Sequence, residues 1–189
     1  MRHTRVPVPV ETGAPGGRTN AHLFGDPAVL VDPAAPDPAL DDAVDGRAVD
    51  HLVLTHTHPD HAGGVARYAA RTGATVWARR GRVDRFVAAT GVEPDRTVAG
   101  GESIRPSVTA LETPGHAPDH LAFETPAGVA CGDLAVAEGS VAVAAPEGEM
   151  RSYLVSLRRL RARAPDRLHP GHGPPIDDPR ATLDRLLAH

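Results

Sequence analysis

The sequence predicts an α/β layered domain in which strands come first and helices are interleaved. Short apolar runs of strand length lie between Pro and Gly turn signals. A separate segment carries Tyr153, Leu154, Leu157 and Leu160 at helical spacing. Because neither an internal repeat nor a linker interrupts this pattern, we expect one domain over residues 1–189.

The composition is that of a globular protein with few aromatic side chains. Hydrophobic residues make up 41% of the chain and aromatic residues 3%, so the core must be built mainly from Val, Leu and Ala. The formal charge of −4 gives no general attraction to nucleic acid or to a membrane surface. All 20 basic residues are Arg, so clusters of Arg carry less functional information than usual.

The first residues of the chain and its single cysteine bear on the cellular compartment of the protein. Cys131 is the only cysteine, which excludes an internal disulfide. The start, MRHTRVPVPVETG, has no apolar core of the kind found in signal peptides, and no later run approaches the length of a membrane span. We therefore expect a cytoplasmic protein with no membrane partner.

The expected elements follow from the apolar runs and their flanking residues. We expect extended segments at residues 6–10, 21–24, 28–31, 51–54, 75–78, 107–112, 121–124 and 129–131. We expect helices at residues 39–44, 65–71, 81–89, 150–162 and 179–187, with Gly73 ending the second of these.

The stretch THTHPDHAGG, residues 55–64, follows directly on a predicted strand. His56 and His58 project to the same side, because extended residues alternate faces. Pro59 keeps His58 out of the helical region, and Asp60 stands where a helix would begin, with His61 in its first turn. The segment can thus direct two His to one point and an Asp and a His to a neighbouring point, which suits two metal ions better than one.

Three later segments supply further ligand types just past predicted strands. His116 follows in TPGH, Asp133 in CGD and His172 in PGHG. A single His in such a loop is more commonly a hydrogen-bonded surface residue, and a single Asp a turn residue. The whole set in this order indicates a metal site, because Zn²⁺ prefers His nitrogen and Asp oxygen.

On these motifs the sequence resembles the metallo-β-lactamase-fold hydrolases over nearly its whole length. The resemblance implies a four-layer αβ/βα sandwich, in which two mixed sheets are flanked by helices and the metals lie at one sheet edge. It also implies which residues hold the two divalent ions: His56, His58 and His116 for one, Asp60, His61 and His172 for the other, and Asp133 as the bridge. Zn²⁺ is the expected metal, with Fe or Mn as alternatives.

Within the family, TPGHAPDHLAF, SYLVSLRRL and HPGHGPPI are similar to the glyoxalase II group and the small endoribonuclease-like hydrolases. Relatives of that branch carry a C-terminal segment that shapes the substrate pocket, whereas residues 173–189 follow His172 here, so the substrate is left open. The implied activity is cleavage of a small ester or thioester by a metal-bridging hydroxide, which Asp60 and Asp133 help to orient.

Several alternatives remain at this point. The Arg residues at 79–85 and 158–163 could meet the phosphates of RNA in a phosphodiesterase, although solvated helix faces explain them as well. A mononuclear iron persulfide dioxygenase would not need the second ligand set, and a non-catalytic binding protein would not need seven ligands. β-Lactam hydrolysis is disfavoured by the Asp at 133.

His120 could orient a ligand through a hydrogen bond or be a surface residue. The oligomeric state is not indicated.

Overall fold

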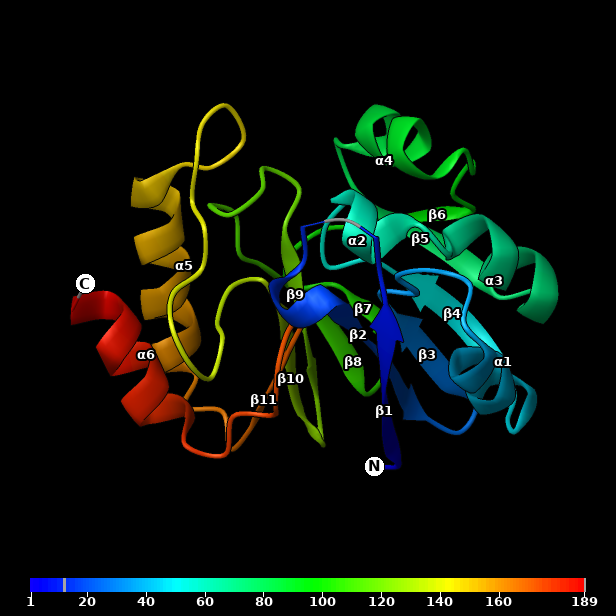
Figure 1. The fold of residues 1–189 in the computed structure, drawn as a ribbon, viewed down its shortest axis with the longest axis horizontal. Helices are drawn as coiled ribbons and strands as arrows, with labels where there is room; N and C mark the ends of the chain where they lie inside the picture. The colour runs from blue at the N-terminus through cyan, green and yellow to red at the C-terminus, as the bar shows by residue number, and fades with distance from the viewer. Residues whose placement is uncertain (12, 189) are drawn as a thin grey trace.

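The computed structural model describes residues 1–11 and 13–188 and contains two β-sheets packed face to face (Figure 1). The first sheet has the order β1-β2-β3-β4-β5-β6, antiparallel from β1 to β3 and parallel from β3 to β6. Its strands are β1 (His3–Pro9), β2 (Arg18–Gly25), β3 (Ala28–Val31), β4 (Val49–Val53), β5 (Thr75–Arg79) and β6 (Arg96–Val98).

The second sheet has the order β11-β10-β9-β8-β7, with β10 and β11 parallel and the remaining pairs antiparallel. Its strands are β7 (Ser103–Arg105), β8 (Val108–Glu112), β9 (Leu121–Thr125), β10 (Gly128–Gly132) and β11 (Leu168–Pro170). Both sheets are therefore mixed, as the resemblance implied.

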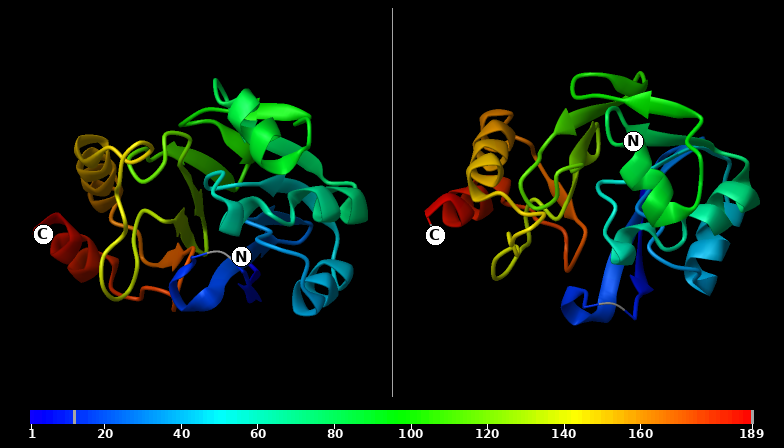
Figure 2. Two further views of the ribbon diagram at one scale, coloured as in Figure 1. Left: turned by 45° about the horizontal axis from the view of Figure 1, so that its top comes forward. Right: turned by 90° about the horizontal axis from the view of Figure 1, so that it is seen from above.

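Helices cover the two outer faces of the sheet pair. α1 (Pro38–Asp45), α3 (Val65–Thr72) and α4 (Val83–Thr90) lie on the side of the first sheet, and α5 (Met150–Ala162) and α6 (Pro179–Ala188) on the side of the second. The grouping persists in both views of Figure 2. A single turn, α2 (Pro59–Ala62), and a 3-10 turn at Pro15–Gly17 complete the helical elements of the described residues. The predicted αβ/βα sandwich is confirmed.

Each interface between layers has its own apolar cluster. Leu30 and Tyr68 belong to the cluster between the first sheet and its helices, and Phe123 to the cluster between the sheets. Leu157 and Leu183 join α5 and α6 to the second sheet. These side chains are almost fully buried, so each layer is held by the removal of apolar surface from water, about 25 cal/mol per Å².

Most expected elements are present, with small shifts at their ends. α5 spans the predicted residues, and Gly73 ends α3 in the left-handed conformation, φ 66°. The helix expected from residue 81 begins at Val83 instead, because Gly81 has φ 77°. The sequence did not predict β6 or β7, and it gave no bounds for the strand before His172, which is β11; each of the three is three residues long. Within the described residues, no helix combines the length and the apolar character needed to span a membrane.

Candidate metal centre

The seven candidate ligands lie at one edge of the sandwich, where strands of both sheets end. His56 and His58 follow β4, and the next two come from the turn α2, which begins after His58 as the sequence predicted. The second sheet contributes the rest: His116 after β8, Asp133 after β10 and His172 after β11. We call this set the candidate centre: His56, His58, Asp60, His61, His116, Asp133 and His172.

Three imidazole nitrogens from both sheets converge in the first part of the candidate centre. His58 Nδ1 lies 3.0 Å from His56 Nε2 and 3.0 Å from His116 Nε2. His56 is buried, whereas His58 and His116 are partly accessible. This is the first of the two triads that the resemblance implied.

The other ring nitrogen of each His is occupied by a partner. His58 Nε2 donates to Glu147 Oε2 at 2.9 Å, and His116 Nδ1 donates to the carbonyl of Ala142 at 2.7 Å. His56 Nδ1 donates to Thr55 Oγ1 at 3.1 Å. These bonds fix the tautomers, so that three lone pairs point at one another. Three facing lone pairs repel one another, and a cation between the nitrogens would relieve this repulsion.

The second triad is assembled in the same way, with a carboxylate in place of one ring. His172 Nε2 lies 3.4 Å from His61 Nε2 and 3.4 Å from Asp60 Oδ2. His61 Nδ1 donates to Asp32 Oδ2 at 2.9 Å, and His172 Nδ1 donates to the carbonyl of Arg18 at 2.9 Å. Both Nε2 atoms therefore point into the second triad, where each can carry a proton or bind a metal ion.

Asp133 lies between the two triads. Its Oδ2 atom is 3.6 Å from His116 Nε2 and 3.3 Å from His172 Nε2, and its Oδ1 atom is 3.5 Å from His61 Nε2. Oδ1 is buried and has no hydrogen-bond partner among the described residues. An unpartnered buried carboxylate oxygen is costly unless a cation meets it, so the residues present fit a divalent metal site.

The negative charges of the carboxylates in and beside the candidate centre favour a positive charge there. Burial alone would lower the pKa of His61, but the charges of Asp133 and Asp32 hold this pKa well above its usual value. Burial likewise acts against the His172 imidazolium, yet the hydrogen bonds of Asp133 and Asp60 raise the pKa of His172 to about 9. Burial would raise the pKa of the Asp133 carboxyl, and His61 and His172 hold it well below its usual range. A proton or a metal ion can supply this charge.

Asp32 belongs to the site although the sequence analysis did not single it out. Its buried carboxylate accepts from Thr55 N at 2.6 Å and from Thr55 Oγ1 at 2.7 Å, in addition to His61 Nδ1. Asp32 has φ 52°, in the left-handed region that Asp tolerates better than most residues. The sequence signal for Asp32 was its position after a predicted strand and before Pro33. This signal is weak, because an Asp before a Pro is more commonly part of a turn.

His120 is buried beside the candidate centre rather than at the surface. Its Nδ1 donates to Thr113 Oγ1 at 2.8 Å, which leaves Nε2 to accept the backbone N–H of Asp133 at 3.2 Å. Gly171 also packs against this region: a Cβ atom there would lie 2.6 Å from both Asp133 Oδ1 and His61 Cε1. A ring and a glycine therefore fix where Asp133 stands.

A cleft of about 370 Å³ opens above the candidate centre. His58, Asp60, His116, Asp133 and His172 line it, together with Pro59 of α2 and residues from two further segments: Gly13, Ala14, Pro15, Val136, Ser140, Val141 and Ala142. None of these described lining residues is an Arg. Some of the Arg residues discussed above are paired away from the cleft, for example Arg80 with Glu102 at 2.7 Å and Arg163 with Glu124 at 2.7 Å, whereas Arg85 bonds to Glu147, the partner of His58.

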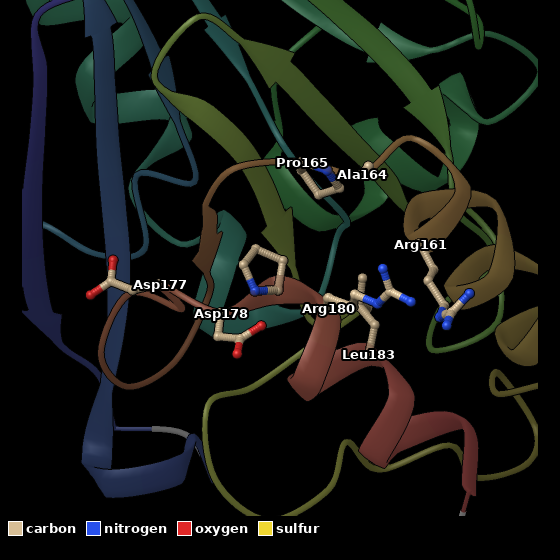
Figure 3. Close-up of a pocket in the computed structure, with 8 residues that line it drawn as sticks. Arg161, Ala164, Pro165, Asp177, Asp178, Arg180 and Leu183 are labelled. Atoms are coloured by element: carbon tan, nitrogen blue, oxygen red, sulfur yellow. The ribbon is translucent and has the colours of Figure 1, made fainter.

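A second pocket, of about 330 Å³, lies between the end of α5 and the start of α6 (Figure 3). Arg161, Asp177 and Arg180 are among its lining residues, and no candidate ligand is. Arg161 is paired with Asp184, and Asp177 with Arg167. Two of its charged side chains are therefore already paired with other residues.

The chain belongs to the metallo-beta-lactamase superfamily, whose sequence pattern matches residues 14–172. The fold agrees: the solved structure of TTHA1623 in a di-iron-bound form is 26% identical, with a TM-score of 0.79 over 96% of this chain and 98% of that one. ETHE1 from Myxococcus xanthus has a TM-score of 0.77 at 22% identity, over 100% of this chain and 85% of that one, and shows the shared fold alone.

Curated relatives agree with the glyoxalase II-like branch of the family. Hydroxyacylglutathione hydrolase from Methylococcus capsulatus is 37% identical over 70% of this chain and 51% of that protein. The enzyme of the same name from Rhodospirillum rubrum is 33% identical over 70% and 52%. The chain thus spans about half the length of these relatives.

Proposed function

We propose that the protein is a metal-dependent hydrolase that cleaves a small ester or thioester at the candidate centre. The observation that carries the proposal is the convergence of five imidazole nitrogens on the floor of one cleft, with Asp133 between the two triads. Similarity to hydroxyacylglutathione hydrolases supports a thioester as the substrate class.

The proposed metal ligands are those of the two triads. His56, His58 and His116 would hold one ion, Asp60, His61 and His172 a second, and Asp133 would contact both. Divalent ions held there would act as Lewis acids and lower the pKa of a water molecule toward neutrality. Zn²⁺ suits this donor set, and the di-iron form of TTHA1623 makes iron the first alternative.

The side chains of the cleft would then position the reactants. Asp60 and Asp133 reach the cleft from opposite sheets, and their carboxylates would accept hydrogen bonds from the attacking water and orient it. Ala14, Val141 and Ala142 form an apolar wall for the acyl group. Because no Arg lines the described part of the cleft, a neutral carbonyl suits it better than the charged backbone of RNA.

Metal content, measured by elemental mass spectrometry on untagged protein purified without added metal, tests the proposal first. We expect about two divalent ions per chain. The same protein is then offered thioesters, simple esters and RNA at low and high salt. We expect thioester turnover that does not depend on salt and is lost after chelation.

Other outcomes would overturn particular parts of this proposal. RNA cleavage that falls steeply with salt would make the protein a phosphodiesterase instead. About one iron per chain, with oxygen uptake on a persulfide, would establish the dioxygenase alternative. Protein that takes up no metal even after reconstitution would refute the enzyme proposal as a whole.

A further inference from the structure

Three histidines far apart in the sequence meet away from the candidate centre. We call His3, His22 and His169 the three-histidine cluster. Each offers a ring nitrogen, and these nitrogens all lie within 4.8 Å of one another. His3 is on β1, His22 on β2 and His169 on β11, so the cluster joins the first sheet to the second.

The cluster is built into the seam between the sheets. His22 is 2% exposed and His169 1% exposed, while His3 is half-buried. His3 stacks on Phe24 with ring centroids 4.5 Å apart, and its centroid lies 4.1 Å from that of His169. Burying three polar rings costs free energy unless their nitrogens find partners, so the partners have to be accounted for.

Two of the rings have their tautomers set by backbone carbonyls. His169 Nε2 donates to the carbonyl of Ala127 at 2.8 Å, and His22 Nε2 donates to that of Pro170 at 3.3 Å. Nδ1 of each ring therefore carries a lone pair. His169 Nδ1 is buried with no hydrogen-bond partner among the described residues. A metal-binding His is commonly held in this way, with its second nitrogen bonded to a carbonyl.

The third ring completes the arrangement. His3 Nε2 lies 3.1 Å from His22 Nδ1. Two nitrogens bound to one tetrahedral zinc ion stand roughly 3.4 Å apart, from a Zn–N distance of about 2.0–2.1 Å. Burial, together with the charges of neighbouring His and Arg residues, lowers the pKa of His3 to about 4, so this ring is neutral at pH 7 and has a lone pair to offer.

We propose that the three-histidine cluster is a second metal site, which binds a divalent first-row transition ion such as Zn²⁺ and ties β1 and β2 to β11. The geometry of three neutral imidazoles with one open position suits borderline ions, which prefer nitrogen ligands. Arg5, Arg47 and Arg167 lie near His3 and disfavour a cation, and no carboxylate belongs to the cluster. The site should therefore fill after the candidate centre.

Equilibrium titration of the whole metal-free protein with Zn²⁺, and with Co²⁺ followed by its visible absorption, tests this proposal. The wild type should take up about three ions per chain, two at the candidate centre and a weaker third. His3→Gln and His22→Gln should each remove the third ion alone. His51→Gln is the matched control: His51 is half-buried and accepts the Trp77 indole N–H at 3.2 Å, which a Gln oxygen can also accept.

Thermal unfolding supplies a readout that is independent of activity. Saturation of the third site should raise the Tm of the wild type by roughly 5 °C beyond the gain seen in His3→Gln. An uptake of only two ions by the wild type, or an unchanged third ion in both His3→Gln and His22→Gln, would overturn the proposal. Asp133→Ala separates it from the proposed function, because that variant should keep the third ion while losing the others.

Discussion

The candidate centre and the three-histidine cluster use the same ring chemistry in different surroundings. In both, a carbonyl or carboxylate accepts from one nitrogen of most of the rings and directs the other nitrogen inward. The candidate centre adds Asp60 and Asp133 and lies under a cleft. The three-histidine cluster sits on strands, without a carboxylate, against Phe24. If both proposals hold, oriented rings alone bind a metal, whereas hydrolysis also requires carboxylates and access for a substrate.

The largest effect is expected from removing the Asp133 carboxylate, which distinguishes the candidate centre from the three-histidine cluster. In Asp133→Ala we expect hydrolysis to fall by at least about 100-fold, because both triads lose their shared oxygen ligand. Turnover and metal content are measured together, and circular dichroism checks that the fold persists. Full activity in this variant would contradict the assignment of Asp133 as the bridge.

A substitution at Asp32, which contacts a candidate ligand and is not one itself, tests whether the orientation of the His ring affects metal binding. Asp32→Asn keeps a residue type that tolerates φ 52° but removes the charge facing His61 Nδ1. We expect metal affinity to fall roughly 10- to 100-fold, with turnover restored by excess metal. Competition with a chelator measures the affinity. Asp41→Asn, which breaks a surface pair with Arg67, is the control and should leave the affinity unchanged.

Substitutions at the two glycines beside His172 distinguish the effect of a steric clash from the effect of backbone conformation. A Cβ at Gly171 would lie 2.6 Å from Asp133 Oδ1, so Gly171→Ala should lower both metal content and stability, the latter by about 1–3 kcal/mol. Gly173 has φ 77° and open space around it, so Gly173→Ala should cost about 1 kcal/mol of stability and keep the metal. Equal metal loss in both variants would argue against the close packing at Gly171.

The smallest effect is expected at the partly exposed edge of the first triad. Glu147 accepts from His58 Nε2, and its side chain is 38% exposed, so water can replace part of its role. Glu147→Gln should weaken metal binding only a few-fold, less than Asp32→Asn does. Chelator competition on the two variants side by side measures the ranking. If Glu147→Gln lowered the metal affinity more than Asp32→Asn, the burial of a partner residue would not determine how much it contributes to metal binding.

Local signals in the sequence predicted the α/β layers and the family resemblance implied the sandwich, and together they singled out seven candidate ligands that the structure brings together. Pro and Gly mark the strand ends after which His116, Asp133 and His172 stand, and Pro59 marks the start of α2. The three-residue strands β6, β7 and β11 carry too few side chains for a pattern, and their neighbours in the sheets stabilise them. The sequence also did not reveal contacts between distant residues, such as Asp32 with His61.

The three-histidine cluster was hidden from sequence analysis for the same reason. His3, His22 and His169 stand on three strands, and no spacing rule connects the first two with the third. Only the packing of the two sheets brings them together. The candidate centre could be predicted because four of its residues share one segment and the other three follow strand ends marked by Pro and Gly, whereas no such signal marks the three-histidine cluster.

The division of ligands between the two sheets also constrains when a metal can be captured. His56, His58, Asp60 and His61 are synthesised early, but His172 follows more than a hundred residues later, and its loop is held by Arg18 and Asn20 of β2. A ribosome-bound chain that has not reached residue 172 therefore offers an incomplete second triad. A metal held tightly by that triad would mark a chain whose synthesis is past residue 172 and whose two sheets have already docked.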